Sequence, residues 1–157
     1  MEDKHKKFYK LMEMINEVSE RISSAHSMPL EYGTGVSLYR SEIHTMQEIG
    51  EKPGINVTEL ADAMGLTKGA VSQTLRKLVK KGLVVKKQAP DNAKEVHLEL
   101  TDRGLIGFNS HQEFLMQMYQ IASEYFGDRF EENIGKFIDV ITDLKAILEI
   151  SEKGIKT

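Results

Sequence analysis

The sequence of 157 residues contains no cysteine and no long apolar run. Without thiols, disulfides, thiolate metal sites and thiol-based redox sensing are excluded. No run approaches the roughly 20 apolar residues that a membrane-spanning helix needs. The opening residues MEDKHKKFYK also lack the apolar centre of a signal peptide. We therefore expect a cytoplasmic protein with no membrane partner.

The usual signatures of an enzyme are missing as well. The sequence shows no nucleophile beside a base, no glycine-rich phosphate loop and no pair of acids at a useful spacing. We expect a protein that is not an enzyme and that requires no cofactor.

Prolines are few, and each stands where a helix or strand should end. They are Pro29, Pro53 and Pro90. Helical spacing of apolar residues predicts a first helix of about five turns or more before the first proline, and a shorter one within Ser37–Ile49. From Thr101 the pattern is helical to the end, with one break near residues 126–128.

Positive charge is concentrated in one stretch of an otherwise acidic chain. From Leu66 to Leu100 there are eight Lys or Arg and three Asp or Glu, a balance of +5; the whole chain is −3, so the remainder carries −8. A compact basic module within an acidic protein is typical of nucleic-acid binding.

The spacing within residues 56–82 predicts two short helices joined by a tight turn. Ala61, Gly65 and Val71 fill the pattern A-x3-G-x5-V: a small residue lets the helices cross closely, glycine takes positive φ in the turn, and valine packs against the first helix. We expect Thr58 to cap a helix that ends at Met64, and Thr67 to cap one that runs to about residue 81, where Gly82 ends it.

A β-hairpin is predicted directly after these helices. Leu83–Gln88 is rich in β-branched residues, Glu95–Leu100 alternates strictly between apolar and polar residues, and APDNAK between them favours a turn. The predicted fold is therefore mainly α with a small β-hairpin wing, an α+β winged helix-turn-helix lobe with further helices on either side.

The second helix of the pair has two distinct faces. Its inward residues are predicted to be Val71, Leu75, Leu78 and Val79. Its N-terminus and outer face carry Thr67, Lys68, Gly69, Ser72, Gln73, Arg76 and Lys80. Amide, hydroxyl and guanidinium groups of this kind contact base edges and phosphates, so we predict that this face binds DNA; the alternative is an ordinary solvated helix face.

Lysines also flank the hairpin, at Lys86, Lys87 and Lys94. In a winged helix such residues contact the phosphate backbone, and the tip reaches the minor groove. The alternative role for lysine on an edge strand is protection against aggregation, and the two roles are compatible.

At this point the sequence resembles the MarR family of bacterial and archaeal regulators. The matching pieces are SEIHTMQEIG, NVTELADAMGLTKGAVSQTLRKLVKKGLV and VHLELTDRG, with flanking helices in the family's number and order. The resemblance implies a homodimer that binds pseudo-palindromic operators in double-stranded DNA and often represses nearby genes. It also implies dimerisation by residues 1–36 and 101–157, with residues 37–100 as the DNA-binding lobe. The dimerisation residues would include Phe8, Leu11, Ile15, Phe130, Ile134, Phe137, Ile141 and Leu144.

The wing departs from the family pattern at one position. Relatives usually carry D-x-R there, with the arginine entering the minor groove, whereas this chain has Ala93 at the arginine position and Lys94 after it. Lysine lacks the planar fork of arginine. We therefore expect more of the specificity to come from Ser72, Gln73 and Arg76.

Two kinds of effector site remain open. A zinc-responsive branch of the family resembles this chain at His26, His44 and His111, but its fourth ligand position falls on Leu115. Three imidazoles and a water can hold zinc. The alternatives are histidines without a metal role, or a crevice for a small aromatic effector lined by Tyr32, Tyr39, Met46 and Phe108.

We accordingly expect a sequence-specific DNA-binding transcriptional regulator, a homodimeric repressor that responds to a small effector. The alternative is a winged helix that serves as a protein-interaction module without operator binding, its basic face docking an acidic partner.

Overall fold

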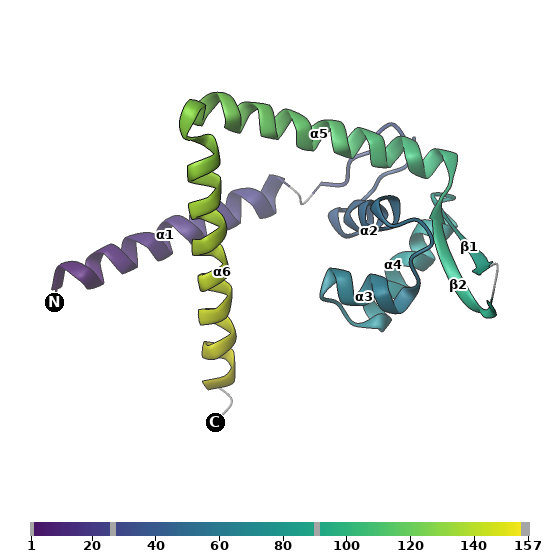
Figure 1. The fold of residues 1–157 in the computed structure, drawn as a ribbon, viewed down its shortest axis with the longest axis horizontal. Coiled ribbons are helices and arrows are strands. Elements are labelled where there is room, and N and C mark those ends of the chain that lie inside the picture. Colours follow the sequence, from purple (N-terminus) through teal and green to yellow (C-terminus); the bar gives the residue numbers. More distant parts are fainter. Residues whose placement is uncertain (1, 26–27, 90–91, 155–157) are drawn as a thin grey trace. The chain divides into compact units, whose positions relative to one another are not determined.

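The computed structural model describes residues 2–25, 28–89 and 92–154 (Figure 1). Within them the chain forms α1 (Glu2–Ala25), α2 (Arg40–Glu51), α3 (Val57–Met64), α4 (Lys68–Lys80), β1 (Val84–Ala89), β2 (Asn92–Leu100), α5 (Asp102–Phe126), the 3-10 turn η1 (Gly127–Arg129) and α6 (Phe130–Gly154). The predicted mainly helical fold with one antiparallel hairpin is confirmed. No helix in the described ranges has the length and apolar character needed to cross a membrane.

The chain divides into two compact units, residues 1–112 and residues 113–157. In the first, α2, α3, α4 and the hairpin lie together and enclose the core (Figure 1). The buried core residues are Leu38, Ile43, Met46, Ile49, Ile55, Leu60, Ala61, Val71, Leu75, Leu78, Leu83, Val84 and Leu98. Burying these side chains is what holds the three short helices together, because helices of this length are marginal alone.

The helix boundaries follow local capping, with one correction to the prediction. The cap of α3 is Asn56, not Thr58: the Asn56 amide oxygen accepts from the backbone N–H of Thr58 and Glu59, and the Glu59 carboxylate accepts from the Asn56 N–H. This reciprocal arrangement satisfies backbone donors that a helix start otherwise leaves open. At α4 the predicted cap is confirmed, since the Thr67 hydroxyl oxygen accepts from the Ala70 N–H.

The turn between α3 and α4 has the predicted geometry. Gly65 lies in the left-handed region with φ 62°, where a glycine meets no steric penalty. Ala61 is buried at the crossing of the two helices, as its small side chain predicts. The pattern A-x3-G-x5-V therefore forms the expected helix-turn-helix.

The hairpin is longer on its second strand than the sequence predicts. Strand β2 begins at Asn92, which pairs with Ala89, so the expected six-residue turn is shorter. The register is irregular between Gln88 and Ala89. This irregularity explains the difference, because the alternating apolar pattern that indicates the strand starts only beyond it.

Backbone hydrogen bonds fix the hairpin to the helical part of the lobe. The Gly54 N–H donates to the Leu98 carbonyl, and the Leu98 N–H donates to the Ile55 carbonyl. The Thr101 N–H donates to the Leu83 carbonyl, and the Thr101 hydroxyl oxygen accepts from the Gly104 N–H at the start of α5. The outer edge of β2 is thus bonded to the segment between α2 and α3, and the base of the hairpin is bonded to the start of α5.

Candidate nucleic-acid interface

Helix α4 presents one face to the core and the other to solvent. Val71, Leu75 and Leu78 are fully buried, as predicted. Val79 was expected to join them, but its side chain is 41% exposed. Consecutive helical residues are about 100° apart, so Leu78 and Val79 do not both point into a narrow seam.

The outer face of α4 carries the side chains that the sequence predicts there. Gln73, Arg76 and Lys80 are exposed and Ser72 is half-buried. Thr67, Lys68 and Gly69 are exposed at the helix start. The first turn of α4 contains no acidic residue, so no carboxylate on that turn opposes an approaching anion.

Sequence reasoning did not assign Lys77 to this face. Gln73, Arg76 and Lys77 together line a shallow hollow of about 330 Å³ on the helix surface. The spacing of four residues between Gln73 and Lys77 places them on the same side one turn apart, and this signal was present in the sequence. Residues that carry an amide, a guanidinium and an ammonium group therefore lie side by side around this hollow.

The wing lysines differ in their surroundings. Lys87, which is exposed, forms an ion pair across the hairpin with Glu99, which is half-buried. Lys86 is exposed and lies opposite Leu98 in the strand register. The side chain of Lys94 lies outside the described residues, so its predicted contact stays a prediction.

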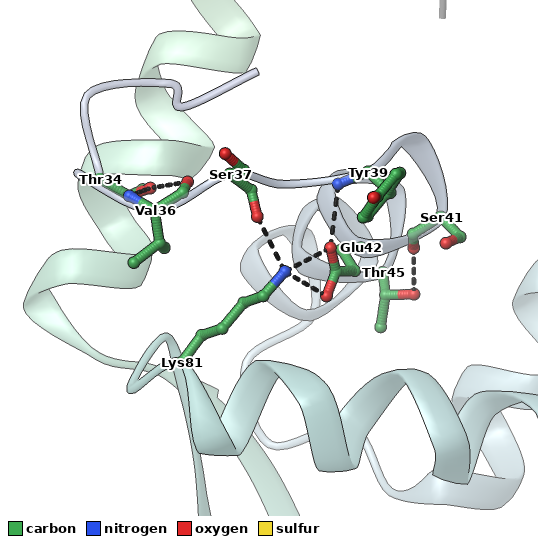
Figure 2. A network of polar contacts seen from close by, with 8 residues as sticks. All are labelled: Thr34, Val36, Ser37, Tyr39, Ser41, Glu42, Thr45 and Lys81. Carbon is green, nitrogen blue, oxygen red and sulfur yellow. Dashed lines mark hydrogen bonds and ion pairs between the residues drawn. The ribbon is translucent and has the colours of Figure 1, made fainter. Parts of the chain in front are cut away.

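A buried polar network holds the C-terminal end of α4 (Figure 2). Lys81, the residue after the helix, places its ammonium nitrogen 2.6 Å from both carboxylate oxygens of Glu42 and 2.8 Å from the Ser37 carbonyl. The Glu42 side chain is 2% exposed, and the Lys81 side chain is 26% exposed. Glu42 also accepts from the Tyr39 N–H at the start of α2.

A second cation reaches the same region from α5. The Arg103 guanidinium donates to the Thr34 carbonyl at 2.7 Å and to the Lys81 carbonyl at 3.3 Å. The Thr34 hydroxyl in turn donates to the carbonyls of Glu31 and Val36. The end of α4, the loop before α2 and the start of α5 are thus joined by hydrogen bonds.

Two of the three histidines predicted as metal ligands lie close together. The rings of His44 on α2 and His111 on α5 have centroids 5.6 Å apart, and Tyr32 packs edge-on against His111 at 5.7 Å. His26 lies outside the described residues. No group of three or more potential ligands forms among the residues that the structure describes, so the zinc site stays a prediction.

The residues around this cluster only partly match the predicted aromatic crevice. Met46 is completely buried in the core, and Phe108 packs against Gly50. Tyr39 is exposed beside the Lys81 ammonium. Tyr32 has φ 46°, and burial raises the pKa of its hydroxyl.

The residues predicted to mediate dimerisation are not part of the buried core. Phe8, Leu11, Phe137 and Ile141 are exposed; Ile15, Phe130, Ile134 and Leu144 are half-buried. Within the second unit, Tyr119 packs edge-on against Phe130, and Phe126 contacts Phe137. A single chain therefore leaves large apolar side chains of α1 and α6 open to solvent.

Similarity to known proteins agrees with this architecture. A family model described as the MarR family matches residues 38–96. The HTH-type transcriptional regulator YhjH of Bacillus subtilis is 33% identical over 132 residues, which cover 82% of this chain and 75% of the relative. The chain belongs to the MarR family of winged helix-turn-helix transcriptional regulators.

Two further proteins are similar to this chain, one in sequence and one in structure. The HTH-type transcriptional regulator PchR of Bacillus subtilis is 31% identical over 106 residues, covering 65% of this chain and 62% of the relative. FabT of Streptococcus pneumoniae, solved in complex with DNA, superposes with a TM-score of 0.72 at 21% identity, covering 90% of this chain and 97% of FabT. At 21% identity, the similarity to FabT shows a shared fold.

Proposed function

We propose that this MarR-family chain binds double-stranded DNA sequence-specifically through α4 and the hairpin. The observation that carries the proposal is the two-sided α4, with its apolar seam buried and its polar, basic face exposed. A recognition helix in the major groove needs this division. FabT, which has a similar fold, was solved in complex with DNA, and this supports DNA binding by the present chain.

The exposed side chains suit distinct roles on a duplex. Arg76 has the planar fork that binds guanine O6 and N7 together, and Gln73 has the amide that pairs with adenine N6 and N7. Lys68, Lys80 and Lys86 are exposed point charges suited to phosphates. Lys77 adds a further cation beside Arg76.

We propose that the active form is a homodimer. The exposed apolar residues of α1 and α6 need a partner surface, and a second copy of the chain offers the same surface in return. Two α4 helices related by two-fold symmetry would then contact successive major grooves, which is the geometry that reads a pseudo-palindromic operator.

We propose repression as the regulatory outcome, with an effector acting near Tyr32, His44 and His111. The proximity of the three rings supports this location. Thermal-shift measurements with Zn²⁺ and with phenolic acids, on wild type and His44→Ala, test it. We expect the effector to raise the melting temperature of the wild type and to leave that of His44→Ala unchanged. If Zn²⁺ stabilises both proteins equally, His44 is not part of a metal site. A reporter gene behind a selected operator tests the sign of regulation.

The rival function is a protein-interaction module whose basic face docks an acidic partner. Gel-shift titrations with mixed-sequence duplex DNA at several salt concentrations separate the two. Binding that weakens steeply with salt is expected for α4 and the wing, because phosphate contacts release counterions. Absence of binding at low salt would favour the rival.

A further inference from the structure

We infer that Lys81 is a positioning residue that sets the orientation of α4 for DNA readout, and that it is not itself a phosphate contact. The inference rests on the proposed DNA-binding function. Lys81 is one of the eight basic residues of the module, and its sequence context KLVKKG gives no reason to separate it from Lys80. The structure does separate them.

The two neighbouring lysines have opposite environments. Lys80, the last residue of α4, is exposed. The Lys81 ammonium group lies against both Glu42 carboxylate oxygens and the Ser37 carbonyl, three acceptors that leave little capacity for a phosphate (Figure 2). Moving that ammonium group to DNA would leave the carboxylate of Glu42 buried without its cation, which is strongly unfavourable.

The partners of Lys81 come from parts of the chain remote from α4. Glu42 lies in the first turn of α2, and Ser37 lies in the loop before it. The Lys81 carbonyl accepts from Arg103 on α5, and its N–H donates to the Lys77 carbonyl within α4. Residue 81 therefore joins the last turn of the recognition helix to three other segments.

This arrangement constrains the helix beyond the end of its apolar seam. Leu78 is the last deeply buried side chain of α4, and Val79 and Lys80 beyond it are exposed. Without the tie made by the Lys81 side chain, the end of α4 would be held by the Arg103 bond to the backbone carbonyl of residue 81 and by the chain that leads into β1. A base contact demands placement within about 0.5 Å, whereas a phosphate contact is more tolerant. Loss of the tie should therefore reduce discrimination between sequences more than it reduces general affinity.

The test compares two lysine removals on the same protein. A duplex is first selected from a random pool by the wild type, and binding to it and to its scrambled version is measured at several salt concentrations. Lys81→Met leaves Glu42 without its cation and is at risk of unfolding, so the informative variant is Lys81→Met with Glu42→Gln, which removes both charges. Lys80→Met is the matched control, and circular dichroism checks that each variant is folded.

We expect the double variant to bind the selected duplex about tenfold more weakly, equivalent to 1.4 kcal/mol, with unchanged affinity for the scrambled duplex and an unchanged salt slope. Lys80→Met should instead weaken binding to both duplexes alike and flatten the salt slope by about one unit. Lys81→Arg, which keeps a cation for Glu42, should retain most of the discrimination.

Two results would overturn the inference. One is a folded double variant that discriminates between the duplexes as well as the wild type does, since the tie would then be structural only. The other is a salt slope that flattens by about one unit in the double variant, since Lys81 would then be a phosphate contact. A wild type that selects no sequence from the pool would instead contradict the proposed function, and this inference with it.

Discussion

Single residues of the hairpin decide how much positive charge the wing offers to a duplex. Lys86 is exposed, whereas Lys87 shares its charge with Glu99. An ion pair close to the surface contributes at most about 1 kcal/mol to stability, and in the proposed complex it would reduce the charge that Lys87 offers to DNA. The sequence shows three equivalent wing lysines, and the ion pair with Glu99 distinguishes Lys87 from Lys86 in the structure.

We predict opposite effects from two substitutions in the wing. Lys86→Ala should weaken binding to all sequences alike and flatten the salt dependence by about one unit. Glu99→Gln should steepen the salt dependence of binding, because Lys87 is then free to contact a phosphate. Fluorescence anisotropy titrations across salt concentrations measure both slopes, with urea unfolding as the check that stability is unchanged. Identical slopes in both variants and the wild type would exclude the wing from the interface.

At the scale of elements, α5 is seated on the lobe through two buried glycines. A side chain at Gly104 would overlap the Leu83 carbonyl, and one at Gly107 would lie 2.7 Å from Thr34 Cγ2. The spacing of three residues places both on one face of α5, followed by the buried His111. This close approach places Arg103 where it donates to Thr34 and Lys81.

We predict that Gly104→Ala lowers the free energy of unfolding by at least about 1–3 kcal/mol, because the added methyl group forces α5 away from the base of the wing. Gly69→Ala is the matched control: it lies in a helix, and its added methyl group would meet only Thr67 Oγ1, at 3.9 Å. Urea unfolding at one fixed protein concentration measures the free energy of unfolding of the two variants and the wild type. Equal stabilities for the two variants would contradict this account of how α5 is seated.

The sequence predicted best those features that depend on residues close together in the chain. The Thr67 cap, the Gly65 turn and the break near residue 127 depend on neighbours in the chain, and all three are present. The sequence prediction placed the cap of α3 at Thr58 instead of Asn56, because both residue types cap helices well. Glu59, three residues after Asn56, is the sequence signal that favours Asn56. The ion pair between Glu42 and Lys81 joins residues 39 positions apart, and no pattern in the sequence indicates it.

At the scale of the whole molecule, the proposed DNA-binding form contains two chains. The apolar stripes of α1 and α6 were visible in the sequence, and the structure leaves many of their side chains exposed in one chain. Surfaces of this kind on a protein mark sites of association. A monomer would present one recognition helix, and it would lose the geometric selection that two half-sites provide.

We predict that sedimentation equilibrium gives the mass of two chains, and that Ile141→Glu shifts the equilibrium towards one. Ile141 is 54% exposed on α6, and a buried carboxylate at an interface would be strongly unfavourable. Leu66→Glu is the control, because Leu66 is similarly exposed, at 48%, but lies in the turn between α3 and α4. A wild-type protein that is monomeric at micromolar concentration would contradict the proposed homodimer.

The most direct test of DNA readout by α4 is the specificity of Arg76→Ala. The wild type and the variant are titrated with the selected duplex and with duplexes changed at one base pair in each half-site. The account predicts a loss of about 1–3 kcal/mol on the selected duplex, with relaxed discrimination at one base pair per half-site and retained discrimination elsewhere. Unchanged affinity and specificity in Arg76→Ala would contradict the placement of the outer face of α4 in the major groove.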